Sequence, residues 1–348
     1  MNLKLFRTVL LIKLVFVTCA FSQRSTARFL LWQPSARSYA MGGVGTALSD
    51  DATATYYNPA NIAFLPGKNV VVSYVKPFPF FDNTHHSYAA LTFPVQEYGT
   101  VGIAYNRIWR EPQFSSSIGT LDAEKPGFFT PTHWVVQLTY AIQLNRLFSA
   151  GVNLGLLKQN YMNLQVSIEE GKGKPVSLSA GVGLFGKGLF SKATYYHVME
   201  QDRHSFFDRI AIDRDSRGVT LGLALMNAGP KVTVLDAERK DPLPTTLALG
   251  ISYLPLVMDD LEVLLAADLV NQLYDAAFLE YAHLGAEIRL LRFWAIRLGY
   301  FGDTSAPKTS YYTYGGGFRC KYFTFNIARY NRSLLSTWHF DATLSVEM

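Results

Sequence analysis

The sequence patterns that could carry chemistry begin with a glycine run. Residues 181–186 read G-V-G-L-F-G, the spacing of a dinucleotide-binding turn, which needs a strand before it and a helix that begins at the glycines. Here the glycines alternate with Val182 and Leu184, as small residues on one face of a strand do. The run therefore predicts a strand and no bound cofactor.

Patterns for metal binding and catalysis are also weak. Asp213 and Asp215, followed by Gly218, resemble the start of a calcium-binding loop. The resemblance fails because Arg217 and Ala224 stand at the fifth and twelfth positions, where calcium needs oxygen ligands. The seven histidines are scattered, and the sequence has no G-x-S-x-G motif. We therefore predict no metal site and no enzyme.

Five charged residues stand among bulky apolar ones at alternating positions. They are Asp268, Glu287, Arg289, Arg297 and Asp341. In a strand that crosses a membrane, an arginine facing lipid at mid-depth would cost about 2–4 kcal/mol, so we expect these charges to face a lumen. Two roles remain open for them: a salt-bridge network that rigidifies a barrel, or a site that selects a substrate.

The elements that must position these charges are strands. Alternation with a period of two recurs along the chain, for example over 148–156 and 294–300. One face is bulky and apolar, and the other is rich in Gly, Ala, Ser and Thr, as suits the crowded interior of a barrel in lipid. Because backbone polar groups in lipid must be paired, such strands must close into a ring.

We predict an all-β fold, an antiparallel transmembrane β-barrel of about fourteen strands, an even number as in bacterial single-chain barrels. The expected strands are 69–75, 86–93, 99–108, 132–143, 148–158, 177–185, 217–226, 245–254, 261–270, 281–290, 293–301, 312–320, 322–330 and 338–348. Residues 186–216 are too long for the short turn that this order requires there. We leave them outside the barrel wall, with no assigned place.

Composition agrees with an exported barrel. Aromatic residues make up 14% of the 348 residues and charged residues 17%, below the usual share of roughly 25%. The net charge of +5 includes no basic run that would indicate nucleic acid.

The N-terminus has the pattern of an export signal. Three basic residues precede a short apolar stretch at 14–21, and small residues fit cleavage before Gln23. The stretch is far shorter than the ~20 residues of a spanning helix, which disfavours an uncleaved anchor. We predict a signal peptide at residues 1–22 and a location in the outer membrane of a Gram-negative bacterium.

Residues 23–66 read as neither a regular strand nor a regular helix. Their glycines permit unusual backbone angles, and Asn58-Pro59 marks a turn. A flexible periplasmic tail would be poorer in Ala, Tyr and Phe, so we expect a plug (or hatch) that folds into the lumen of the barrel formed by 67–348. The residues that define it are Arg37, Met41, Gly42, Gly43, Gly45, Asp50, Asp51, Asn58, Pro59 and Ala60.

A set of short motifs begins in this segment and continues along the chain: Ala36-Arg37, Met41-Gly42-Gly43, Ala47–Ala52, Asn58-Pro59-Ala60 with Phe64, Leu223–Gly229, Leu243-Pro244, Ala266, Asp268, His283–Glu287 and Arg297–Tyr300. In these motifs the chain resembles the PorV/PorQ family of the Bacteroidetes, relatives of the FadL-type fatty-acid channels. This resemblance implies a FadL-like barrel of fourteen strands with an N-terminal hatch, and a role in or near type IX secretion.

The resemblance leaves two main functions open. The first is an accessory of type IX secretion or surface display, whose partners are outer-membrane lipid, secreted proteins with type IX sorting domains and other secretion components. The second is a FadL-like transporter of hydrophobic small molecules. A purely structural outer-membrane protein is a third interpretation. We favour the first.

Overall fold

The computed structural model describes residues 25–48, 51–76, 84–95, 98–115, 127–160, 175–190, 218–233, 240–258, 260–274, 279–331 and 337–346. The predicted signal peptide at 1–22, Asp50 and residues 191–217 lie outside these ranges. Within the described ranges, no helix combines the length and the apolar character needed to cross a membrane.

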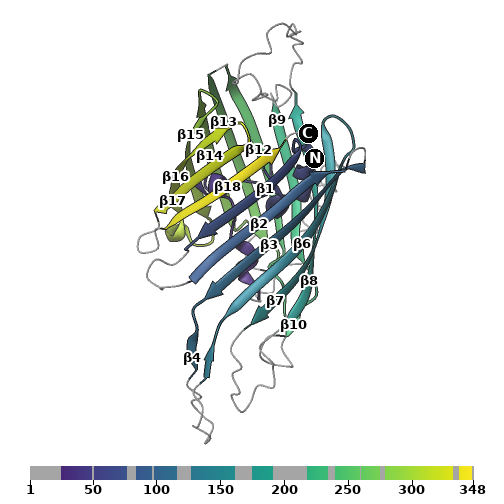
Figure 1. Cartoon of the computed structure of the whole chain (residues 1–348), viewed down its shortest axis with the longest axis vertical. Helices are drawn as coiled ribbons and strands as arrows, with labels where there is room; N and C mark the ends of the chain where they lie inside the picture. Colours follow the sequence, from purple (N-terminus) through teal and green to yellow (C-terminus); the bar gives the residue numbers. More distant parts are fainter. Residues whose placement is uncertain are drawn as a thin grey trace, which may run out of the picture.

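Fourteen strands form one closed ring in which each strand pairs antiparallel with its two neighbours, and the ring closes between β1 and β18. Figure 1 shows the tilted strands of this barrel. The strands are β1 (Lys68–Val75), β2 (Thr84–Pro94), β3 (Thr100–Arg110), β6 (Thr132–Gln143), β7 (Phe148–Asn160), β8 (Val176–Leu189), β9 (Val219–Ala228), β12 (Thr246–Val257), β13 (Leu261–Gln272), β14 (Tyr281–Leu290), β15 (Trp294–Asp303), β16 (Tyr311–Cys320), β17 (Phe323–Asn331) and β18 (Trp338–Val346). The predicted fourteen-strand antiparallel barrel is confirmed.

Two parts of the sequence-based assignment need correction. Strand β8 continues to Leu189, so residues 186–189, which we placed outside the wall, belong to it. The pairing of β8 with β9 shifts register between Gly186 and Leu189, which interrupts the alternation that marks a strand in sequence. Two connections expected as loops also contain short two-stranded sheets, β4 (Gln113–Ser115) with β5 (Gly127–Phe129) and β10 (Val232–Thr233) with β11 (Lys240–Asp241).

The outer face of the barrel is apolar. In β7, Val152, Leu154 and Leu156 point outward and are 45–62% exposed, while Asn153 between them is buried. The same alternation of exposed bulky side chains and buried small or polar ones recurs in the other long strands. Large apolar side chains on the outside of a closed ring are stable when lipid surrounds them, so the wall is lipid-facing.

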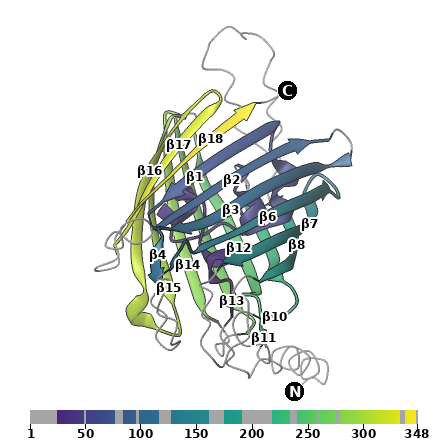
Figure 2. The ribbon, with the colours of Figure 1, turned by 60° about the horizontal axis from the view of Figure 1, so that its bottom comes forward.

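Most of the described part of the chain that precedes β1 lies inside the ring of strands (Figure 2). We call residues 25–48 and 51–66 the N-terminal segment; it contains η1 (Arg28–Leu31), α2 (Ala36–Ala40), α3 (Ala54–Tyr57) and η2 (Pro59–Phe64). Helix α2 packs against β15–β18, whereas η2 packs against β3, β6, β7 and β8 on the other side of the ring. The segment therefore crosses the lumen. A further short helix, η5 (Pro307–Thr309), lies between β15 and β16.

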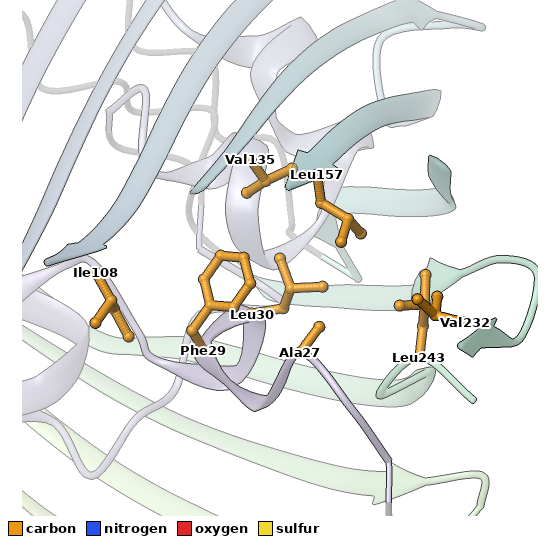
Figure 3. Close-up of a cluster of buried hydrophobic side chains, with 8 residues drawn as sticks. All are labelled: Ala27, Phe29, Leu30, Ile108, Val135, Leu157, Val232 and Leu243. Carbon is orange, nitrogen blue, oxygen red and sulfur yellow. The ribbon is translucent and has the colours of Figure 1, made fainter. Parts of the chain in front are cut away.

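The N-terminal segment also runs along the barrel axis. Phe29 and Leu30 in η1 pack in a buried cluster with Ile108, Val135 and Leu157 (Figure 3). These three wall residues lie near the strand ends from which the long connections leave. By contrast, η2 contacts β7 near its start, where only the short turn 144–147 joins it to β6. The segment thus leads from the long-connection end to the short-turn end, where β1 begins.

Local sequence explains the turns of the segment. The Ser35 side chain accepts a hydrogen bond from the Ser38 amide at 3.2 Å and so caps α2. The Asn58 side chain caps η2 in the same way, and Pro59 takes the first position, where a missing N–H costs nothing. Gly42 and Gly43 after α2 have φ angles of 76° and 97°, which favour glycine.

Candidate functional site

The contact surface between the N-terminal segment and the barrel wall holds nearly all of the sequence-predicted site residues that the structure describes. Its centre is Glu287 in β14, which is fully buried. Arg37 of α2 binds it at two points, with Nε 2.8 Å from Oε2 and Nη2 3.0 Å from Oε1. Arg297 Nε lies 2.5 Å from Oε2, and Arg289 Nε lies 2.8 Å from Oε1. One carboxylate thus joins three guanidinium groups.

This ion cluster continues to the N-terminus of α2. Arg297 Nη1 donates to Asn326 Oδ1 at 2.9 Å, and Asn326 Nδ2 donates to Asp341 Oδ1 at 2.7 Å. The other oxygen of Asp341 accepts the Ala36 amide at 2.6 Å. Because a helix start leaves backbone N–H groups unpaired, a buried carboxylate here satisfies a donor that has no intrahelical partner. Side chains from four strands, β14, β15, β17 and β18, therefore jointly anchor α2 to the wall.

Asp268 in β13 binds the segment farther along. Its Oδ2 accepts hydrogen bonds from the backbone amides of Gly45 and Thr46, each at 2.8 Å. Asp268 is not in hydrogen-bond contact with the Glu287 cluster in the described residues. The five charges predicted to face the lumen thus all lie on the inner face, but they divide into one connected set of four and one separate anchor.

Asn58 ties two parts of the segment to the wall. Its Nδ2 donates to the carbonyl oxygens of Thr46 (3.1 Å) and Leu184 (3.0 Å). Its Oδ1 accepts the Ala60 amide at 3.1 Å. The side chain is fully buried, and its two donated bonds and one accepted bond match the NH₂ and C=O groups of an amide side chain.

The remaining predicted residues of the segment are placed as follows. Met41 packs with Val44 against Leu264 and Ala266, and Pro59 and Ala60 lie against Gly151 of β7. The Gly42 amide donates to Thr313 Oγ1 at 2.8 Å, and the Gly43 carbonyl accepts from Gln33 Nε2 at 3.2 Å. The Asp51 carboxylate accepts from the Thr53 amide at 2.8 Å. Burial raises the pKa of the Tyr57 phenol in α3 well above its usual value, so its ring stays neutral.

Eight inward glycines of the wall, one each in eight strands, lie directly against the segment. We call them the wall glycines: Gly102, Gly151, Gly183, Gly222, Gly250, Gly285, Gly299 and Gly315. A Cβ on Gly151 would lie 2.5 Å from the Pro59 carbonyl carbon, and one on Gly285 would lie 2.5 Å from the Met41 oxygen. A glycine-rich inner face is expected from the sequence, but its contact with the segment is not. The signal was present, because glycine recurs mid-strand at inward positions.

No three His, Cys, Asp or Glu side chains in the described ranges lie together as a metal site would require. The contacts that the structure describes at this surface are ion pairs, hydrogen bonds and close backbone packing.

Comparison with known proteins agrees with the geometry. The family described as "Type IX secretion system protein PorV" matches residues 22–276. A search of curated proteins finds no match to the chain.

Solved structures with the same fold include two toluene transporters. The Pseudomonas putida toluene transporter TodX has a TM-score of 0.52 and 12% identity, covering 94% of this chain and 98% of its own. The Ralstonia pickettii toluene transporter TbuX has a TM-score of 0.50 and 13% identity, covering 89% and 96%. A Pseudomonas aeruginosa FadL homologue also matches, with a TM-score of 0.45, 10% identity and coverage of 93% and 99%. At such identities the two toluene transporters show the fold alone.

Proposed function

The chain belongs to the PorV family of type IX secretion system proteins, and from this premise we propose that it is an accessory of that pathway whose bore is closed by its own N-terminal segment. The family and the barrel place the protein in the outer membrane and associate it with type IX secretion. The role of the segment as a plug, and the identity of the partners, are the proposed parts.

The observation that carries the proposal is the attachment of the segment to opposite sides of the ring. Arg37 and Ala36 bind β14 and β18, while the Ala60 carbonyl accepts from Ser149 of β7 at 2.8 Å. The wall glycines bring the backbone of the segment against the wall itself. A bore filled in this way has no room for a polypeptide in transit, which favours an accessory that binds secreted proteins over a conduit for them.

The binding surfaces for partners are then the strand ends and the outer wall. We propose that secreted proteins with type IX sorting domains bind at the long-connection end, which faces the cell exterior, and that other secretion components contact the wall beside outer-membrane lipid. The support is topological: long connections of outer-membrane barrels face outward and short turns face the periplasm.

The test is a chromosomal deletion followed by complementation. We expect the deletion to lower the amount of surface proteins that carry type IX sorting domains, measured by mass spectrometry of surface-labelled cells, and the wild-type gene to restore it. Outer-membrane proteins without sorting domains serve as the internal control. Unchanged surface levels of the sorting-domain proteins in the deletion strain would contradict the proposal.

A FadL-like transporter remains the alternative, and its support is the fold shared with the toluene transporters. The same deletion strain separates the two functions. Loss of toluene or fatty-acid uptake with normal surface display would favour transport, because an accessory of secretion has no effect on small-molecule uptake.

A further inference from the structure

A cavity of about 230 Å³ lies inside the barrel at its long-connection end. Thr246, Gln272 and Tyr281, which line it, are terminal residues of β12, β13 and β14 at that end. On its other side the cavity is bounded by η1 and the residues that follow it. Its volume is just below the ~300 Å³ at which ligand pockets usually begin, so it suits a molecule with a single ring.

Aromatic rings form much of the wall of this cavity. Trp32 and Tyr56 come from the N-terminal segment, and Tyr281 and Phe301 come from β14 and β15. The ring centroids of Tyr281 and Phe301 are 5.3 Å apart, so they form one continuous apolar surface. Aromatic walls of this kind bind apolar groups, and the faces of the rings attract cations.

Four buried polar side chains, each at most 3% exposed, line the cavity: Thr46, Asp268, Gln272 and His283. Asp268 Oδ2 holds the segment, but Asp268 Oδ1, Gln272 Oε1 and His283 Nε2 have no hydrogen-bond partner among the described residues. Buried polar groups in native proteins are nearly always paired, so these atoms point to a ligand. Two of the three are oxygens that only accept, and the complementary molecule must donate.

The spacing of the two acceptors sets the shape of that molecule. Asp268 and Gln272 are four residues apart on the inner face of β13, about 13 Å along a strand. His283 is the cross-strand partner of Asp268 and lies at the deep end with it. Gln272 lies at the mouth, where its Nε2 donates to Glu280 Oε1 at 3.1 Å. An elongated molecule with a donor at each end spans the two.

Charge selects the kind of donor. The carboxylates of Asp268 and Glu280 lie in or beside the cavity, and Asp303 is the cross-strand partner of Tyr281. Arg28, which is exposed, is the cation among the lining residues. We propose that the cavity binds a small aromatic amine, with its ammonium group at Asp268 Oδ1, its ring between the aromatic walls and a second donor at Gln272 Oε1.

This binding site requires no passage through the barrel and is independent of the proposed role in secretion. Asp268 lines the cavity, and its Oδ2 accepts hydrogen bonds from the Gly45 and Thr46 amides. A ligand at Asp268 therefore meets the docked N-terminal segment as the floor of its site. Binding would favour the docked segment, since a ligand stabilises the state that it binds.

The test uses the full-length barrel purified in detergent and isothermal titration with tyramine, which has an ammonium group, one ring and a hydroxyl. We expect saturable binding with one site per chain. 4-Hydroxyphenylacetate, in which a carboxylate replaces the ammonium group, and 4-ethylphenol, which is neutral, should each bind about tenfold more weakly or not at all. No saturable tyramine binding, or equal binding of the carboxylate, would overturn the proposal.

Two variants locate the site. Ala248→Leu fills the cavity from β12 and should weaken tyramine about tenfold or more, whereas Ala286→Leu, the same change on the lipid-facing side of β14, should leave it unchanged. Asp268→Asn keeps an oxygen for the two amides and removes the charge, and it should also weaken tyramine. Heat-dependent gel mobility verifies that each variant is folded. Undiminished affinity in either folded cavity variant would show that tyramine binds elsewhere.

Discussion

Arg37 in helix α2 and Glu287 in strand β14 form a two-point ion pair across 250 residues of sequence, with N–O distances of 2.8 and 3.0 Å. The pair joins the part of the chain that precedes the first strand to a strand of the C-terminal half. Planar two-point pairs of this kind fix orientation as well as distance. The ion pair thus fixes the N-terminal segment against the inner face of the barrel.

Removing either partner of this pair should destabilise the barrel, and removing Glu287 should cost more than removing Arg37. Glu287→Gln leaves buried guanidinium groups without their carboxylate, for which we expect a loss of about 3–5 kcal/mol. Arg37→Met should cost less, because Glu287 keeps Arg297 and Arg289. The fraction folded in urea, read from gel mobility in detergent, measures both. Arg146→Met in an exposed turn is the control, and a greater loss in Arg37→Met than in Glu287→Gln would contradict the assignment.

A side chain on a wall glycine should displace the N-terminal segment. In Gly151→Ala, the new Cβ would meet the Pro59 carbonyl carbon at 2.5 Å and the Ala60 nitrogen at 2.6 Å. Because the new methyl group would overlap this backbone, we expect η2 to move away from the wall. Ion conductance in planar bilayers should then rise. Gly316→Ala is the matched control, since its nearest neighbour would be the Ala295 oxygen at 3.2 Å. Equal conductance of the two variants would show that the segment does not close the bore.

The lipid-facing assignment of the outer wall predicts a cost that depends on depth. Leu154 in the middle of β7 and Leu144 in the turn before it are 62% and 61% exposed. Leu154→Arg should lower stability by about 2–4 kcal/mol, whereas Leu144→Arg should change it by about 0–1 kcal/mol. Urea unfolding in lipid vesicles measures the difference. In a water-soluble barrel both changes would be neutral, and that result would refute the membrane assignment.

Replacing Asn58 with alanine should destabilise the protein less than replacing it with aspartate. Asn58→Ala loses the bonds to Thr46, Leu184 and Ala60, at about 1–3 kcal/mol for each buried group left unpaired. Asn58→Asp keeps the bond to the Ala60 amide but places a carboxylate against two carbonyl oxygens. We therefore expect the aspartate variant to be the less stable of the two, measured by gel mobility in urea. The reverse order would mean that the Asn58 amide hydrogens are not directed at these carbonyls.

The strands of this barrel could be predicted because one physical requirement acts on every strand. Lipid on one side and a crowded lumen on the other force the alternation seen in Val152, Leu154 and Leu156. The inner-face placement of Asp268 and Asp341 followed from the same alternation. The rule fails where the register shifts, and for that reason the end of β8 at Leu189 was missed.

The partners across the lumen could not be predicted in the same way. Alternation gives the face on which Glu287 lies but not its height in the barrel or the residue opposite. Those depend on the register of all the strands between β1 and β14, which no local pattern encodes. The contact of Gly285 with Met41, like the pairing of Arg37 with Glu287, depends on the closed ring.

The attachment of α2 has a consequence for the order in which the protein is built. The residues that hold α2, namely Glu287, Thr313 and Asp341, lie in the strands that are synthesised last. Asp341 lies in β18, the strand whose pairing with β1 seals the ring. The N-terminal segment thus cannot make these contacts until the last strands of the ring are in place.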